Sequence, residues 1–207
     1  MRRGLVLIMV LAIFLSLSLN VFAEKSINYV LKCFEAVSGT DYDKTIKLCT
    51  ECIKHVPYSA PGCYINRGNA YADKGMYDDA IKDFTFIIKY INPKNYLAYN
   101  NRGNAYDDKG MYDKAIADYN KAIELDPKLA GAYYNRGNAY RDKGMYDRAI
   151  EDYNKAIELN PKNAEAYYNR GIAYKLKGMY DRAIEDFNKA IELNPECAKA
   201  YNNILLP

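Results

Sequence analysis

The sequence contains no tryptophan and only one histidine, His55, among its 207 residues. It also lacks a glycine-rich loop of the kind that holds phosphate groups, and it has no serine in a recognisable nucleophile turn. These absences remove the residue sets on which most catalytic sites are built. We therefore expect a protein without enzymatic activity, cofactor or metal.

A marked excess of positive charge is also missing, with 29 Lys and Arg residues against 26 Asp and Glu residues. Two of the bases, Arg2 and Arg3, lie in the first 23 residues, which contain no acid, so the remaining chain has 27 bases and 26 acids. Nucleic-acid binders and polybasic membrane sensors normally show a clear basic excess. The composition therefore argues against nucleic acid as a partner.

The first 23 residues have the pattern of a signal peptide. Arg2 and Arg3 precede an apolar run from Leu5 to Leu19 that only serines interrupt. Val21-Phe22-Ala23 then predicts cleavage before Glu24. The alternative is an uncleaved membrane anchor, since the stretch from Leu5 to Ala23 is just long enough to span a bilayer. Either alternative predicts that the chain from Glu24 onward is extracytoplasmic, in a periplasm or secreted.

An internal repeat of 34 residues fills most of the remaining chain. The segment 64–71, Tyr-Ile-Asn-Arg-Gly-Asn-Ala-Tyr, recurs in related form at residues 99–106, 133–140 and 167–174. The sequence Lys-Gly-Met-Tyr-Asp begins at Lys74, Lys109, Lys143 and Lys177, and a proline closes each repeat at Pro93, Pro127, Pro161 and Pro195. The repeat from Pro61 has one extra residue between Phe84 and Pro93. Such a period indicates supersecondary units stacked on one another.

Each repeat is predicted to form two helices. In the last repeat, Tyr167, Gly171 and Tyr174 share one face of a first helix. Gly178 is expected to end that helix in a left-handed conformation, and Asp181 to cap the second helix. Gly171 and Ala183 lack bulk at the point where the two helices should pass closest.

These residues resemble the tetratricopeptide repeat family. The shared pattern is an aromatic residue at repeat position 4, Gly at 8, Tyr at 11, Ala at 20, an aromatic residue at 24, Ala at 27 and Pro at 32. Tyr replaces the usual Trp at position 4, and Arg replaces the usual Leu at position 7. The resemblance covers four repeats, 61–95, 96–129, 130–163 and 164–197, a degenerate cysteine-rich repeat in 24–60, and a partial one in 198–207. It implies an all-α, right-handed solenoid of antiparallel helix hairpins.

The resemblance further implies that the first helices line a concave groove, with positions 2, 5, 6, 9, 12 and 13 facing an extended peptide or a partner helix. The residues expected to bind the peptide are Asn66, Asn101, Asn135 and Asn169 at position 6, Asn69, Asn104 and Asn138 at position 9, Tyr134 and Tyr168 at position 5, and Asp73, Asp108 and Asp142 at position 13. An amide both donates and accepts, so such a row can grip a peptide backbone. The alternative is that recent duplication copied these asparagines without selecting them.

The charges of the expected groove favour a neutral or basic ligand. Position 12 varies, with Ala72, Asp107, Arg141 and Lys175, and acids gather toward the middle repeats. Chaperone-binding members of the family hold a terminal carboxylate with lysines at positions 5 and 2. Position 5 here contains no lysine, so an acidic tail is a poor candidate ligand.

Arginine at position 7 and aspartate at position 23 form a second regular set. The expected structural ion pairs are Arg67 with Asp83, Arg102 with Asp118, Arg136 with Asp152 and Arg170 with Asp186. The two positions lie nearly opposite each other in an antiparallel hairpin, and their net contribution to stability is expected to be small.

Four of the five cysteines, Cys33, Cys49, Cys52 and Cys63, lie in the degenerate repeat and its junction with the next one. In an oxidising compartment they predict one or two disulfides, and three full pairings are open. Cys33 with Cys49 or Cys52 is attractive, because these residues would face each other across the hairpin. A redox pair of Cys49 and Cys52 is a weaker alternative, since both lie in mid-helix. His55 fits a zinc site with them poorly.

The sequence therefore predicts a non-catalytic scaffold that binds an extended peptide or protein segment in the concave groove. One alternative is self-assembly through the ends of the stack, where Ile204, Leu205 and Leu206 leave an apolar edge. A second alternative is a thiol-disulfide enzyme that uses Cys49 and Cys52.

Overall fold

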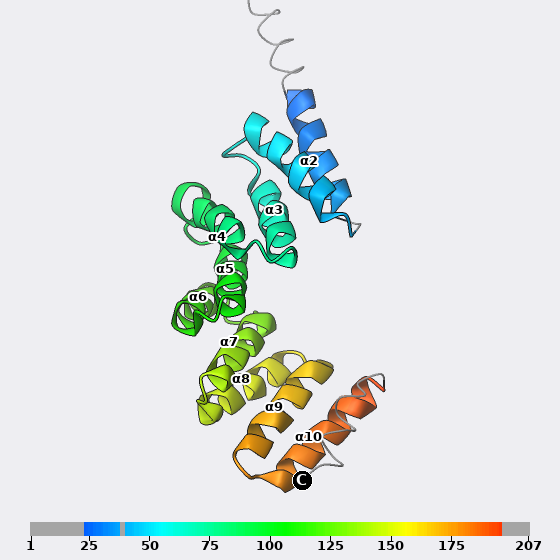
Figure 1. Cartoon of the computed structure of the whole chain (residues 1–207), viewed down its shortest axis with the longest axis vertical. Helices are drawn as coiled ribbons and strands as arrows, with labels where there is room; N and C mark the ends of the chain where they lie inside the picture. The colour runs from blue at the N-terminus through cyan, green and yellow to red at the C-terminus, as the bar shows by residue number, and fades with distance from the viewer. Residues whose placement is uncertain (1–22, 38–39, 196–207) are drawn as a thin grey trace, which may run out of the picture. The chain divides into compact units, whose positions relative to one another are not determined.

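The computed structural model describes residues 23–37 and 40–195, and these residues form helices without any strand (Figure 1). The predicted signal peptide apart from Ala23, the fifth cysteine Cys197 and the partial repeat 198–207 lie outside the described residues. None of the described helices combines the length and the hydropathy needed to cross a membrane. The described residues divide into two compact units, an N-terminal unit that ends at Ile91 and a C-terminal unit that begins at Asn92.

The N-terminal unit holds the degenerate repeat and the first full one. Residues 23–36 are helical, and α2 (Tyr42–His55) packs on α3 (Pro61–Asp73), which packs on α4 (Tyr77–Phe86). The π-helix η1 (Ile87–Ile91) directly follows α4. A π-helix takes in more residues per turn than an α-helix, so it absorbs the one extra residue of this repeat.

The C-terminal unit consists of three helix pairs. The helices are α5 (Tyr96–Asp108), α6 (Tyr112–Leu125), α7 (Ala130–Asp142), α8 (Tyr146–Leu159), α9 (Ala164–Leu176) and α10 (Tyr180–Leu193). Each first helix packs on the second helix of its own repeat, while α7 also packs on α6 and α9 on α8. The first helices α5, α7 and α9 additionally contact one another in sequence. They therefore share one continuous face.

A short Lys-Gly-Met turn links the two helices of each full repeat. Gly178 has φ +74°, as the sequence predicts, and this left-handed residue lets the N–H of Met179 bond to Tyr174 O at 2.9 Å. Asp181 was expected to cap α10, but the N-cap residue is Met179 and no side chain caps it. The turn closes so tightly that the helix begins at Tyr180, which places Asp181 in the first turn. A carboxylate there still interacts favourably with the helix dipole.

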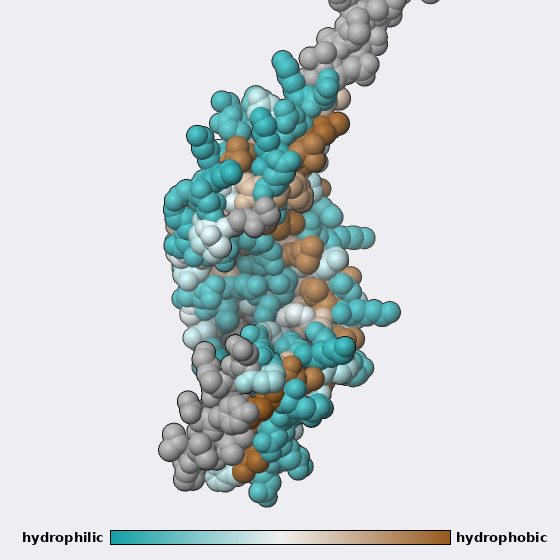
Figure 2. Space-filling view, turned by 90° about the vertical axis from the view of Figure 1, so that its right-hand side faces the viewer, coloured by the Kyte–Doolittle hydropathy of each residue, from teal (hydrophilic) through white to brown (hydrophobic). Residues whose placement is uncertain are grey.

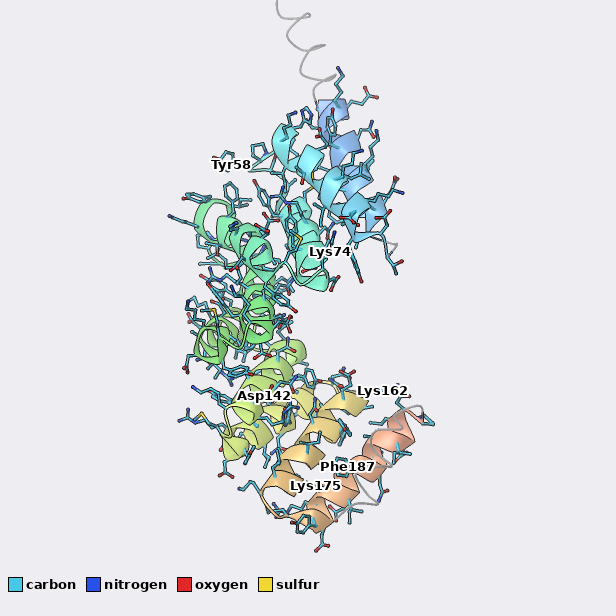
Figure 3. All side chains as sticks on the ribbon, in the orientation of Figure 1. Tyr58, Lys74, Asp142, Lys162, Lys175 and Phe187 are labelled. Carbon is cyan, nitrogen blue, oxygen red and sulfur yellow. A yellow bond between two sulfur atoms is a disulfide. The ribbon has the colours of Figure 1, made fainter. Side chains whose placement is uncertain are left out.

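The closest approach inside each full repeat lies between the glycine at position 8 and the ring at position 24. A Cβ on Gly171 would lie 2.7 Å from Phe187 Cε1 and 3.2 Å from the backbone oxygen of Ala183. Phe187, labelled on α10 in Figure 3, thus fills the space that the missing side chain leaves. The same contact recurs as Gly68 with Phe84, Gly103 with Tyr119 and Gly137 with Tyr153.

The degenerate repeat replaces this contact with a disulfide. Cys33 and Cys49 occupy positions 8 and 24, and they are bonded with their Cα atoms 4.6 Å apart. A second disulfide joins Cys52 at position 27 to Cys63 at position 3 of the next repeat. In the C-terminal unit these two positions hold buried alanines, Ala122 and Ala132 or Ala156 and Ala166. Both disulfides therefore stand at packing positions that small side chains or a ring occupy elsewhere.

Candidate functional site

The shared face of α5, α7 and α9 is the region where the sequence placed most ligand-binding residues. It is formed by repeat positions 5, 6, 9, 12 and 13, which span about 120° of helix surface. We call it the first-helix face. Its residues are Asn100, Asn101, Asn104, Asp107 and Asp108 on α5, Tyr134, Asn135, Asn138, Arg141 and Asp142 on α7, and Tyr168, Asn169, Ile172, Lys175 and Leu176 on α9. Figure 3 labels Asp142 and Lys175 at the ends of α7 and α9.

Hydrogen bonds between asparagines connect the first helices across this face. Asn135 Nδ2 donates to Asn104 Oδ1 at 2.9 Å and to Asn100 Oδ1 at 3.3 Å. One repeat later, Asn169 Nδ2 donates to Asn138 Oδ1 at 3.3 Å. We call Asn104, Asn135, Asn138 and Asn169 the asparagine ladder. Position 6 of one repeat thus bonds to position 9 of the preceding repeat.

The second helices support the ladder through their tyrosines. Tyr119 Oη donates to Asn104 Oδ1 at 2.8 Å, and Tyr153 Oη donates to Asn138 Oδ1 at 2.7 Å. The last full repeat has Phe187 at position 24 and Ile172 at position 9. Neither side chain carries a polar group, so this repeat has no equivalent of the Tyr–Asn hydrogen bond. The position-9 asparagines therefore join a first helix both to its own hairpin and to the next repeat.

This geometry adds a role that sequence reasoning missed. Sequence reasoning offered ligand binding or chance duplication, but the ladder also fastens consecutive repeats together. An amide oxygen can accept two hydrogen bonds, and Asn104 Oδ1 and Asn138 Oδ1 already accept two each, so the ladder oxygens that keep capacity for a ligand are those of Asn135 and Asn169. Asn169 Oδ1 accepts one, from Arg141 Nη1 at 3.0 Å, and Asn135 Oδ1 accepts none from the part of the chain that the structure describes.

The remaining asparagines of the predicted set have different surroundings. Asn101 Oδ1 accepts a hydrogen bond from Asn100 Nδ2 at 3.2 Å. In the N-terminal unit, Asn66 Nδ2 lies 3.8 Å from Cys33 Sγ, and Asn69 is exposed on α3. The regular array of bonds from position 6 to position 9 is therefore described for the C-terminal unit.

The predicted tyrosines on the face are held firmly. Tyr134 Oη donates to Glu165 Oε2 at 3.3 Å and accepts from Asn169 Nδ2 at 2.8 Å, while its ring lies 6.1 Å from the ring of Tyr153. The ring of Tyr168 lies 5.7 Å from that of Phe187. Fixed aromatic rings offer a ligand apolar contact at low entropic cost, because little side-chain motion remains to be lost on binding.

Acidic side chains gather between α5 and α7. Asp142 accepts a hydrogen bond from Arg141 Nε at 2.8 Å, whereas Asp107 Oδ1 is buried without a partner among the described residues. The pKa of Asp107 is raised to about 6, mainly by burial and in part by the charges of Asp142 and Asp108, against the opposing effect of Arg141. Three carboxylates and the guanidinium of Arg141 therefore share this part of the face. Asp73, the other predicted acid, is exposed at the end of α3 in the N-terminal unit.

Each of the four expected Arg–Asp pairs forms, and each is bidentate. In the repeat 130–163, Arg136 Nε lies 2.8 Å from Asp152 Oδ2, and Nη2 lies 2.7 Å from Oδ1. The others are Arg67 with Asp83, Arg102 with Asp118 and Arg170 with Asp186. Arg136 Nη1 also donates to Asn120 Oδ1 of the preceding repeat at 2.5 Å. The pairs connect helices within and between repeats. Their aspartates are buried, so these carboxylates are not available for contact with a ligand.

The two cysteines of the Cys49-Thr50-Glu51-Cys52 motif belong to different disulfides. Cys49 is bonded to Cys33 and Cys52 to Cys63, and the four sulfur-bearing side chains are buried. His55 stacks on Tyr29 at 4.0 Å between ring centroids and lies 3.9 Å from Glu51. Among the described residues no three Cys, His, Asp or Glu side chains come together in a way that could hold a metal ion.

Comparison with known proteins places these features in a family. Family models described as tetratricopeptide repeat match residues 61–89, 96–129, 118–151 and 164–197, and one described as TPR repeat matches residues 137–178. No curated protein sequence matches the chain.

Solved structures with the same fold give a second comparison. One crystal structure of MamA is 32% identical, with a TM-score of 0.67, and the match covers 77% of this chain and 92% of that chain. A second MamA crystal structure is 30% identical, with a TM-score of 0.70 and coverage of 89% and 100%. YrrB, described as a TPR protein with an unusual peptide-binding site, is 22% identical with a TM-score of 0.68 and coverage of 87% and 92%. At that identity YrrB shows the fold alone.

Proposed function

Because the chain belongs to the tetratricopeptide repeat family, we propose that it is a non-catalytic scaffold that binds an extended segment of another protein on its first-helix face. The family and the fold support protein interaction as the general role. The observation that carries the more specific proposal is the arrangement of α5, α7 and α9, where amide oxygens, fixed tyrosines and acidic side chains share one surface.

The chemistry of this face suits a neutral or basic peptide. Acceptor oxygens of Asn135 and Asn169 suit backbone N–H groups, and the carboxylates of Asp108 and Asp142 give the face a negative charge that suits a lysine or arginine side chain. Because the ladder holds the acceptors in place before the ligand arrives, less conformational entropy is lost on binding.

The test is crosslinking capture from the cell envelope, with the chain from Glu24 as bait, followed by measurement of Kd for the captured partner. Asp108→Lys reverses a charge on the face, and Glu151→Lys makes the same change at an exposed site on α8. We expect Asp108→Lys to weaken binding at least tenfold and Glu151→Lys to leave Kd unchanged. Equal affinity for both variants would contradict the proposal.

We also propose that the scaffold works outside the cytoplasm. The support is the signal-peptide pattern of residues 1–23 together with two disulfides, which persist in oxidising compartments. Cell fractionation with a thiol-alkylation assay tests this proposal. Recovery of reduced, cytoplasmic protein that retains residues 1–23 would contradict it.

A second candidate role is self-association through the exposed edge of α10. Ile184 at position 21 is 40% exposed, whereas the equivalent Ile116 and Ile150 are 9% exposed beneath the following first helix. Light scattering over a range of concentrations tests this role. We expect Ile184→Lys to abolish any concentration-dependent growth in mass, and a wild-type chain that stays monomeric would exclude the role.

A further inference from the structure

The helix of residues 23–36 presents a polar face where other first helices present an apolar one. In the C-terminal unit, positions 3 and 10 of α7 and α9 face the preceding repeat, and they hold fully buried alanines: Ala132, Ala139, Ala166 and Ala173. In the helix of residues 23–36 these positions are Asn28 and Glu35, with Lys32 at position 7, and all three are exposed. Terminal repeats of solenoids require such a polar outer face.

A different face of the same helix carries exposed apolar side chains. Ile27, Leu31, Phe34 and Val37 are 59%, 54%, 51% and 48% exposed. They occupy positions 2, 6, 9 and 12, which are ligand-facing positions in the repeat pattern. We call them the apolar strip. Figure 2 shows that hydrophobic residues interrupt the mainly hydrophilic surface in small patches, one of them near the top of the view.

The strip replaces the asparagines of the full repeats. Position 6 is Asn and position 9 is mostly Asn in the later repeats, whereas the degenerate repeat has Leu31 and Phe34 there. Phe34 continues the surface onto α3, because Gly62 leaves room for its ring: a Cβ on Gly62 would lie 2.5 Å from Phe34 Cζ. The N-terminal unit therefore presents an apolar surface at the helix positions where the C-terminal unit presents amides.

The charges beside the strip indicate what covers it. Glu24 and Glu35 border Leu31 on one edge, seven residues before it and four after it, whereas Lys25 and Lys32 lie further round the helix from the strip. Two strips paired antiparallel about a twofold axis would bring the two glutamate edges together, which opposes a second copy as occupant. Four half-exposed side chains also fall well below the ~800 Å² per partner of a standard interface.

Resting on the proposed scaffold function, we infer that the apolar strip is a docking surface for a partner segment with aliphatic or aromatic side chains flanked by lysine or arginine. The apolar side chains cover Ile27, Leu31 and Phe34, and the positive charge lies beside Glu24 and Glu35. The strip thus selects the partner by side chain, while amide oxygens of the ladder contact a backbone and read no side chain.

The probe is a library of random twelve-residue peptides displayed on phage and selected on the disulfide-bonded chain from Glu24. We expect the enriched peptides to combine apolar residues with Lys or Arg. Their Kd is then measured for Leu31→Asn and Phe34→Asn, which install the residue of positions 6 and 9 in the later repeats. Each change should weaken binding roughly ten- to a hundredfold, because it removes a buried apolar contact.

Asn28→Ala, on the polar outer face of the same helix, is the matched control and should leave Kd unchanged. Circular dichroism checks that each variant is folded. Glu35→Gln should weaken binding several-fold at low salt and less at high salt, since salt screens exposed charges.

The outcomes separate the strip from the general scaffold role. Peptides that bind the strip variants as tightly as the wild type, but lose affinity for Asp108→Lys, would overturn the strip and leave the first-helix face as the binding site. A selection that enriches no peptides would also overturn the proposal that the strip is a docking surface. The capture experiment with Asp108→Lys would then be the test of the scaffold function. A dimer that Leu31→Asn dissociates would identify a second copy as the occupant and overturn the peptide partner.

Discussion

Asn135 Nδ2 donates a hydrogen bond to Asn104 Oδ1 at 2.9 Å, and this bond joins the first helices of two consecutive repeats. The pair is separated by 31 residues in the sequence. It accounts for an otherwise unfavourable choice, because Asn in mid-helix costs very roughly half a kcal/mol relative to Ala. The side chain offsets that cost by fixing the spacing of α5 and α7, which in turn sets the spacing of the acceptors on the first-helix face.

The first prediction concerns the ladder itself. Asn135→Ala removes two hydrogen bonds between first helices and should lower the free energy of unfolding by about 1–2 kcal/mol, with the gain in helix propensity opposing part of the loss. Chemical denaturation measures the change. Asn188→Ala, at an exposed position of α10, is the matched control and should leave stability within about 0.5 kcal/mol. A ladder variant as stable as this control would contradict a structural role.

The second prediction concerns the close contact at position 8. A Cβ on Gly103 would lie 2.6 Å from Tyr119 Cε1, so Gly103→Ala should destabilise the chain by about 1–3 kcal/mol through overpacking. Gly131, also helical, has no atom within 4 Å of such a Cβ. Gly131→Ala should therefore leave stability unchanged or raise it by up to about 1 kcal/mol. Thermal unfolding of both variants measures the difference, and equal melting temperatures would contradict the packing argument.

The sequence predicted features that repeat locally and missed features that depend on how repeats stack. Gly178, Pro195 and the aromatic spacing mark helix ends and hairpins directly, so the all-α solenoid and its repeat pattern followed from them. The bond from Asn135 to Asn104 depends on the rotation between successive hairpins, which no single repeat encodes. The same holds for Cys52 with Cys63, which joins two repeats, whereas Cys33 with Cys49 lies within one hairpin and was among the favoured pairings.

The third prediction is a pH dependence that originates in Asp107. The pKa of Asp107 is about 6 in the folded chain because of burial, against ~3.9 for an aspartate in an unfolded chain. The folded state thus binds the proton of the Asp107 carboxyl group more tightly than the unfolded state does. Protonation of Asp107 therefore gives its full stabilisation below pH ~4, and this stabilisation is lost as the pH rises through about 6.

Asp107→Asn should therefore be more stable than the wild type at pH 7, by about 1 kcal/mol once solvent screening of this half-buried group is allowed for. At pH 4 the two proteins should be equally stable. Urea denaturation at several pH values measures the difference, with Glu151→Gln at an exposed mid-helix position of α8 as the control. A difference that is constant from pH 4 to pH 7 would show that ionisation of Asp107 is not its cause.

The last prediction tests whether the Cys33–Cys49 disulfide substitutes for a packing contact. These residues occupy the positions that Gly68 and Phe84 hold in the next repeat, where the ring lies against the glycine. Cys33→Ser with Cys49→Ser should cost about 2–4 kcal/mol, because it removes the crosslink and buries two hydroxyl groups. Cys33→Gly with Cys49→Phe should recover part of that loss by installing the ring contact of the full repeats. Thermal unfolding with and without reductant measures both, and a Gly/Phe variant no more stable than the Ser/Ser variant would show that the degenerate hairpin has lost the geometry of the others.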